Sequence, residues 1–126
     1  MKQRFFICNN CGNLVAMVER SGVPMMCCGS EMQEIIPGTS DGAKEKHVPA
    51  FTIKDNIVEV TVGEVEHPME KKHYIKWISI QTNKGNQRKT LKYDDEPKAS
   101  FALLPDEKVE AVYAYCNLHS LWMAEA

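Results

Sequence analysis

Four cysteines in the first quarter of the chain have the spacing of a metal site. "CNNC" places Cys8 and Cys11 three positions apart, and "PMMCCGSEM" sets Cys27 and Cys28 side by side. A disulfide within the adjacent pair is unfavourable, because neighbouring Cα atoms lie ~3.8 Å apart and a relaxed disulfide needs roughly 4.4–6.8 Å. Four thiolates in a distorted tetrahedron suit zinc or iron, and these residues alone do not separate the two. The alternative is that the cysteines are merely buried.

The histidines and the last cysteine form a second candidate set, which is His47, His67, His73, Cys116 and His119. Taken singly, each histidine has an ordinary explanation at the surface or in the core, and Cys116 could be a small buried apolar residue. Taken together, they leave no histidine unused, and we expect one shared metal site. Zinc usually closes with four ligands, whereas five ligands leave an octahedral ion one open position, which suits redox-active iron.

Composition narrows the class of protein. The chain has 126 residues, 44% of them hydrophobic and 25% charged, with a net charge of −2. This balance gives no indication of binding to nucleic acid or to an anionic membrane. The beginning, "MKQRFFICNN", has no apolar stretch of signal-peptide length, and no run approaches a membrane span, so we expect a cytoplasmic protein. In a reducing compartment, five cysteines are better explained as thiolates and metal ligands than as disulfides.

The elements that must position these residues divide at a linker. "IIPGTSDGAKEKH" (residues 35–47) is rich in turn-forming residues, which predicts a boundary near residue 37 and domains at 1–37 and 38–126. The first segment is too short to build its own core and needs a metal to fold. The second predicts short strands at 51–53, 58–62, 74–82, 90–93 ("TLKY"), 99–104 and 108–116. This pattern favours a mainly β protein whose larger domain is an immunoglobulin-like antiparallel β-sandwich.

The chain resembles the desulfoferrodoxins, the two-iron type of superoxide reductase. The resemblance covers essentially the whole chain and rests on five blocks in the family's order: "CNNC", "CC", "EKHVP", "HPMEKKH" and "CNLH". It implies a rubredoxin-like (desulforedoxin) domain with Fe(Cys)4 at the first four cysteines, which favours iron over zinc there. It also implies an Fe(His)4(Cys) centre in the sandwich, with the four histidines equatorial and Cys116 axial.

The resemblance further implies an activity and two residues that assist it. Superoxide would be reduced to hydrogen peroxide, with electrons from a donor such as rubredoxin, in a cytoplasmic homodimer. Lys46 would steer the anion to the iron, and Glu45 would fill the sixth position of the ferric resting state. Their ordinary explanations are a solvated lysine and a surface carboxylate. Two rival functions stay open: a zinc knuckle beside a partner-binding sandwich, and an electron carrier with a saturated iron.

Overall fold

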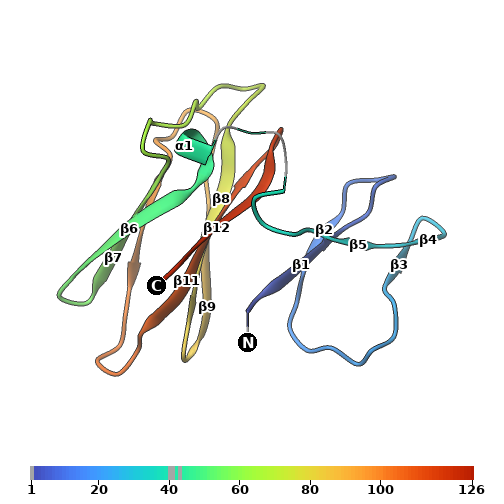
Figure 1. Cartoon of the computed structure of the whole chain (residues 1–126), viewed down its shortest axis with the longest axis horizontal. Helices are drawn as coiled ribbons and strands as arrows, with labels where there is room; N and C mark the ends of the chain where they lie inside the picture. The colour runs from blue at the N-terminus through green and yellow to red at the C-terminus, as the bar shows by residue number, and fades with distance from the viewer. Residues whose placement is uncertain (1, 40–41, 43) are drawn as a thin grey trace. The chain divides into compact units, whose positions relative to one another are not determined.

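The computed structural model describes residues 2–39, 42 and 44–126, without the side chains of residues 44 and 45. The chain divides into two compact units, Met1–Ile36 and Pro37–Ala126 (Figure 1). Among the described residues, no helix has the length and apolar character needed to cross a bilayer.

The first unit is built from short strands. Strand β1 is the middle strand of a three-stranded sheet of order β2-β1-β5, and β3 pairs with β4 in a separate two-stranded ladder. The bounds are β1 Arg4–Ile7, β2 Leu14–Met17, β3 Met26–Cys27, β4 Ser30–Glu31 and β5 Gln33–Glu34. Only Phe5, Cys8 and Met32 are buried among the described residues of this unit. So small an apolar core agrees with a segment that folds around a metal.

The second unit is an antiparallel sandwich of two sheets. One sheet has the order β10-β7-β6 and the other the order β12-β11-β8-β9. The bounds are α1 Lys44–His47, β6 Pro49–Lys54, β7 Ile57–Val62, β8 Ile75–Thr82, β9 Gly85–Thr90, β10 Lys98–Ala102, β11 Val109–Cys116 and β12 Ser120–Glu125. The predicted fold class, mainly β with a small metal-knuckle unit and an antiparallel sandwich, is confirmed.

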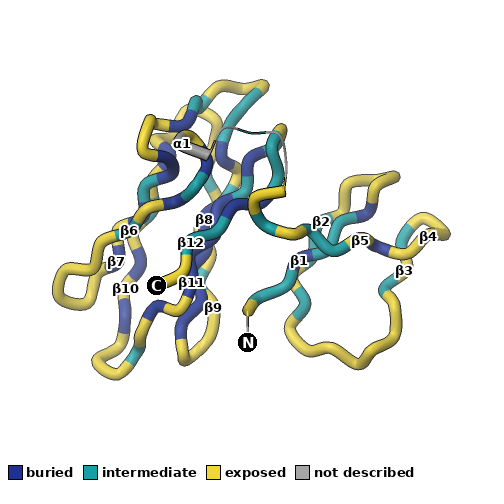
Figure 2. Tube along the Cα trace, viewed as in Figure 1, coloured by how far each residue is buried: buried dark blue, intermediate teal, exposed yellow. Residues whose placement is uncertain are grey.

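Alternating residues of the strands form the core between the two sheets. Val58, Val60 and Val62 of β7 face inward, and Val112 and Ala114 of β11 meet them from the opposite sheet. Each of these side chains has an exposed fraction of 1% or less. The buried trace runs along β8 and β11 in Figure 2. A close-packed core of this kind gives the loops at the end of the sandwich a rigid base.

Two strands of the second sheet differ from the sequence prediction. Strand β9 is Gly85–Thr90, so the predicted strand "TLKY" (residues 90–93) is wrong except for its first residue. The sequence "GNQRKT" is polar and lacks alternation, and it becomes a strand because a two-residue turn folds it back onto β8, from Thr82↔Gly85 to Trp77↔Thr90. Strand β12, which the sequence prediction omitted, pairs with β11 from Ala111↔Glu125 to Cys116↔Ser120.

Candidate metal centres

The four N-terminal cysteines come together from two tight turns. Cys8 directly follows β1, and its carbonyl accepts a hydrogen bond of 2.9 Å from the amide of Gly12. Cys27 ends β3, and Cys28 follows it with a positive φ of 53°. Adjacent residues of an extended chain point to opposite sides. The left-handed backbone at Cys28 removes this opposition and lets both thiols face the same point.

The sulfur atoms have the separations of a tetrahedral metal site. The four Sγ atoms lie within 4.8 Å of one another. Cys11 Sγ is 3.6 Å from Cys27 Sγ, and Cys27 Sγ is 4.0 Å from Cys28 Sγ. A tetrahedron with metal–sulfur bonds of roughly 2.3 Å has edges of about 3.8 Å, so one ion fits between the sulfurs without moving the backbone.

The pKa values of these thiols also call for a cation. Backbone amides of Cys11 and Asn10 donate to Cys8 Sγ and lower the pKa of that thiol to about 6. The thiols of Cys11, Cys8 and Cys27 crowd Cys28 and raise its pKa to about 12. The first thiolate therefore forms readily, whereas the last does not form at neutral pH without a positive charge. A metal ion supplies that charge and deprotonates all four thiols.

The second cluster gathers residues from four separate segments of the sandwich unit. His47 is the last residue of α1, and Cys116 is the last residue of β11. His67 and His73 lie in the loop that joins β7 to β8, and His119 lies in the turn from β11 to β12. Backbone hydrogen bonds between Glu70 and His73, of 2.9 and 3.0 Å, close the loop on itself. One end of the sandwich thereby brings distant parts of the sequence to a single place.

The four imidazole rings form a square. Its sides join ring centroids in the order His47, His67, His73 and His119, with lengths of 4.5, 4.7, 5.1 and 4.8 Å. Rings that share a side are nearly perpendicular, at 78°, 81°, 73° and 86°. The diagonal from His47 to His73 is longer, at 6.1 Å, and those two planes are inclined by only 29°. Four nitrogens can therefore point at one central ion.

The hydrogen bonds of the histidines leave nitrogen lone pairs facing the centre. His67 Nδ1 donates to the Pro68 carbonyl at 2.7 Å, so His67 Nε2 carries the lone pair. His47 Nε2 lies 3.1 Å from both His67 Nε2 and His119 Nδ1. His73 Nε2 is buried with no hydrogen-bond partner among the described residues. A buried nitrogen left unpaired is unfavourable unless a metal ion binds it, and this donor set fits one.

Burial favours the neutral form of two of the imidazoles, those of His67 and His73. It lowers the pKa of His67 to about 4. It also lowers the pKa of His73, where the charge of His119 acts in the same direction. A metal binds only the neutral imidazole, so these shifts prepare both side chains for coordination.

Cys116 lies beside the square of rings and belongs to the sandwich core. It is fully buried, and its Sγ is 3.9 Å from His119 Nδ1. Burial raises the pKa of the Cys116 thiol, and the backbone amides of Leu118 and His119 partly offset this by donating to the sulfur. Its Sγ and the possible ligand nitrogens of His47, His67 and His73 all lie within 4.8 Å of one another.

Two residues that the sequence analysis passed over support the histidines. The Trp122 ring stacks on His47 at 4.9 Å, and its Nε1–H donates to the His119 carbonyl at 2.9 Å. Gly42 lies so close to two of the histidines that a Cβ added to it would be 2.8 Å from His119 Cβ and 2.9 Å from His47 Cε1. Neither residue has a metal-binding side chain, so only contacts between distant segments reveal them.

The two charged residues predicted beside the site both lie in α1. Lys46 is exposed, and its charge lowers the pKa of His73 while the charge of Glu70 raises it. This influence of Lys46 is the smallest of those that act on the pKa of His73, after burial, His119 and Glu70, and it indicates that the ammonium group lies within electrostatic range of that ring. Glu45 precedes Lys46 in the helix, and its side chain lies outside the described residues.

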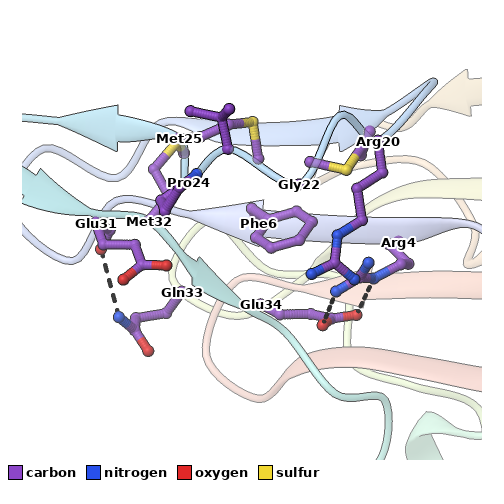
Figure 3. A pocket seen from close by; sticks show the side chains of 12 residues that line it. Arg4, Phe6, Arg20, Gly22, Pro24, Met25, Glu31, Met32, Gln33 and Glu34 are labelled. Carbon is purple, nitrogen blue, oxygen red and sulfur yellow. Dashed lines mark hydrogen bonds and ion pairs between the residues drawn. The ribbon is translucent and has the colours of Figure 1, made fainter.

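A separate groove of about 290 Å³ lies in the first unit (Figure 3). Phe6 and Met32 line it, and Arg4 forms two hydrogen bonds with Glu34 at its edge, of 2.8 and 2.6 Å. None of the nine residues of the two clusters lines it. The groove is therefore not part of either candidate metal site.

Comparisons with known proteins agree with this geometry. A family model described as desulfoferrodoxin matches residues 39–125. The chain is 46% identical over 119 residues to a desulfoferrodoxin of Nitratidesulfovibrio vulgaris, with 94% of this chain and 93% of that protein covered. A desulfoferrodoxin homolog of Archaeoglobus fulgidus is 45% identical over 117 residues, which are 93% of this chain and 92% of that protein.

Solved structures give a similar result. The superoxide reductase from Treponema pallidum matches with a TM-score of 0.83 and 37% identity, over 99% of this chain and 100% of that chain. The one-iron superoxide reductase from Giardia intestinalis matches with a TM-score of 0.56 and 36% identity, over 66% of this chain and 98% of that chain.

Proposed function

The chain belongs to the desulfoferrodoxin family, and from this premise we propose that it is a superoxide reductase. The chain has two iron centres, which correspond to the cluster of four cysteines and the cluster of histidines with Cys116. The proposed reaction consumes one superoxide, one electron and two protons and yields one hydrogen peroxide. The observation that carries the proposal is the square of imidazole rings beside a buried thiol.

We assign the ligands residue by residue. Centre I is held by Cys8, Cys11, Cys27 and Cys28, and centre II by His47, His67, His73, His119 and Cys116. The domains predicted from the sequence, 1–37 and 38–126, would then hold one centre each. In this assignment the four imidazoles and the Cys116 thiolate would hold the ion, and a position that none of them takes would be left for substrate. When bound at centre II, a ferrous ion supplies the electron that superoxide takes up.

Lys46 acts on the approach of the substrate. Superoxide is a small anion, and an exposed ammonium group beside the ring square raises its local concentration and its rate of arrival. The same charge stabilises the negative charge that stays on the oxygen atoms after the electron transfer. Its influence on the pKa of His73 is the support for this role.

Cys116 and the partly buried histidines of centre II influence whether the O–O bond is cleaved or intact peroxide is released. A thiolate donates electron density, and in haem thiolate enzymes this donation favours cleavage of the O–O bond. The release of intact peroxide must therefore depend on something else. His73 and His119 are only partly buried, so water reaches this side of the site and can deliver the two protons. Centre II also has four neutral imidazoles where the haem enzymes have a porphyrin, and this difference likewise favours the release of intact peroxide.

Further parts of the proposal rest on the family alone. Glu45 would occupy the open position after the product leaves. The electron donor would be a rubredoxin, and the protein would be a cytoplasmic homodimer. Cys11 and Cys28 are exposed, so centre I is open to electron exchange at the surface of its unit. Reduction of both centres by a purified rubredoxin, followed in the visible spectrum, tests the donor.

One experiment decides between the proposed function and its rivals. Purified protein is analysed for iron and zinc, reduced, and mixed with superoxide generated by pulse radiolysis. About two irons per chain, with fast oxidation of centre II and one peroxide formed per superoxide, supports the proposal. A colourless protein with one zinc would indicate a structural module instead. Two irons that react slowly with superoxide would indicate an electron carrier.

A further inference from the structure

The residue after Cys116 makes three hydrogen bonds to the chain on either side of His73. The Asn117 amide donates to the Tyr74 carbonyl at 3.2 Å. The Asn117 side-chain Oδ1 accepts from the Tyr74 amide at 2.9 Å, and its Nδ2 donates to the Lys72 carbonyl at 3.0 Å. Lys72 and Tyr74 are the two neighbours of His73. One carboxamide therefore fixes both peptide units that flank this histidine.

This contact links two of the proposed ligands directly. Asn117 is covalently attached to Cys116, and its side chain fixes the backbone of His73. Because β11 and β8 are paired at Cys116↔Ile75, the contact lies just beyond the last pair of the ladder. Among the described residues, the backbone of His73 itself is hydrogen-bonded to Glu70 within its own turn. The distance between the His73 ring and the Cys116 thiol is thus set across this asparagine.

The same arrangement occurs at the other end of the same strand pair. Asn83 follows β8 as Asn117 follows β11. Its amide donates to the Lys108 carbonyl at 3.1 Å, its Oδ1 accepts from the Lys108 amide at 2.7 Å, and its Nδ2 donates to the Asp106 carbonyl at 3.1 Å. Each asparagine thus both donates to and accepts from the backbone of one residue, which is Tyr74 for Asn117 and Lys108 for Asn83. Each also donates from its side chain to the carbonyl of the residue two positions before that one. At the Asn83 end, the bracketed residue is Glu107 and no metal cluster lies there among the described residues.

We propose that Asn117 is a positioning residue that holds His73 in register with Cys116 at centre II, whereas Asn83 is its purely structural counterpart. The proposal depends on the proposed function in one respect, because it requires that His73 and Cys116 bind the same ion. The pair offers an internal control that most positioning residues lack. Loss of either carboxamide removes two side-chain hydrogen bonds from the end of the same ladder, so the two variants share their general effect on the fold.

The test compares Asn117→Ala with Asn83→Ala in the full-length, iron-loaded protein. The measured quantity is the rate at which ferrous iron passes from centre II to an added chelator, with centre I as the reference in the same sample. Supporting interactions around metal ligands typically change metal affinity 10–100-fold. We therefore expect Asn117→Ala to release centre II iron at least tenfold faster than wild type and to shift the thiolate absorption band of the ferric form. Asn83→Ala should leave both unchanged.

Equal release rates for the two alanine variants, at equal thermal stability, would overturn the proposal. If Asn117→Ala does not fold, Asn117→Asp replaces it, with Asn83→Asp as the control for the added charge. The aspartate keeps the acceptor for the Tyr74 amide, but an oxygen now faces the Lys72 carbonyl where the Nδ2 donor was, so faster iron release than in wild type and in Asn83→Asp is expected, and a wild-type rate would overturn the proposal. Superoxide consumption is measured separately, so failure of the enzymatic function leaves this comparison intact.

Discussion

Substitution of Gly42 by alanine tests whether the square of rings is held to the tolerance that a metal site needs. The added Cβ would lie 2.8 Å from His119 Cβ and 2.9 Å from both His119 Cγ and His47 Cε1. Carbon atoms in contact stay roughly 3.5 Å apart, so each of the two histidines has to move away by about 0.6 Å or more. Metal–ligand distances tolerate deviations of only about 0.2 Å. We expect centre II to lose iron affinity by at least tenfold, and the fold to lose about 1–3 kcal/mol from overpacking.

The assay for Gly42→Ala is iron content per chain together with the visible spectra of both centres. Centre I should keep its iron and its absorption. Gly85→Ala is the matched control, because an added Cβ there meets nothing within 4 Å and only the positive φ of 147° makes the substitution unfavourable. If Gly42→Ala binds iron at centre II as tightly as wild type, with an unchanged spectrum, the ring positions are not restrained as argued.

Four more predictions address single residues. Cys116→Ser should abolish the thiolate charge-transfer band of ferric centre II and most superoxide consumption; an unchanged visible spectrum would contradict the axial assignment. Lys46→Ala should slow superoxide capture roughly tenfold at low salt and flatten its ionic-strength dependence, with both irons retained, as measured by pulse radiolysis. Cys28→Ser should remove the absorption of centre I and spare the reaction with superoxide. The pKa of His67 is about 4 in the folded chain against an ordinary 6.5, so the unfolded state takes up the extra proton as the pH falls between these values. The metal-free chain should therefore lose stability across that window, and denaturation curves at pH 7 and pH 5 that coincide would contradict the assigned burial.

The sequence was most informative where residue type alone carries the chemistry. Cysteine and histidine are the side chains that hold iron, and their two groups along the chain already separated two centres. The structure brings Cys8, Cys11, Cys27 and Cys28 together and gathers the histidines with Cys116. The unusual "CC" pair is explained by a backbone feature, the positive φ of Cys28, that no side-chain pattern predicts.

The sequence was least informative where a contact joins distant segments. Trp122 supports His47 across 75 positions, and Asn117 reaches the flanks of His73 across more than 40. Asn117 stands inside the "CNLH" block, but the local sequence does not show what its side chain contacts, and no motif of the sequence analysis includes Trp122. Strand β9 was misplaced for a related reason, because its polar residues gain their conformation from pairing with β8 and not from an apolar face.

The two metal ions have different relations to the protein around them. In the first unit, Cys8 is one of only three buried side chains among the described residues, so the metal site forms a large part of the core and should be inseparable from folding. In the second unit, a dozen buried residues pack between the sheets, and Cys116 is just one of them. The sandwich can therefore hold the ring square in place before iron binds. A preorganised site suits an iron that must change its oxidation state in every turnover while its ligands stay still, because little reorganisation accompanies each electron transfer.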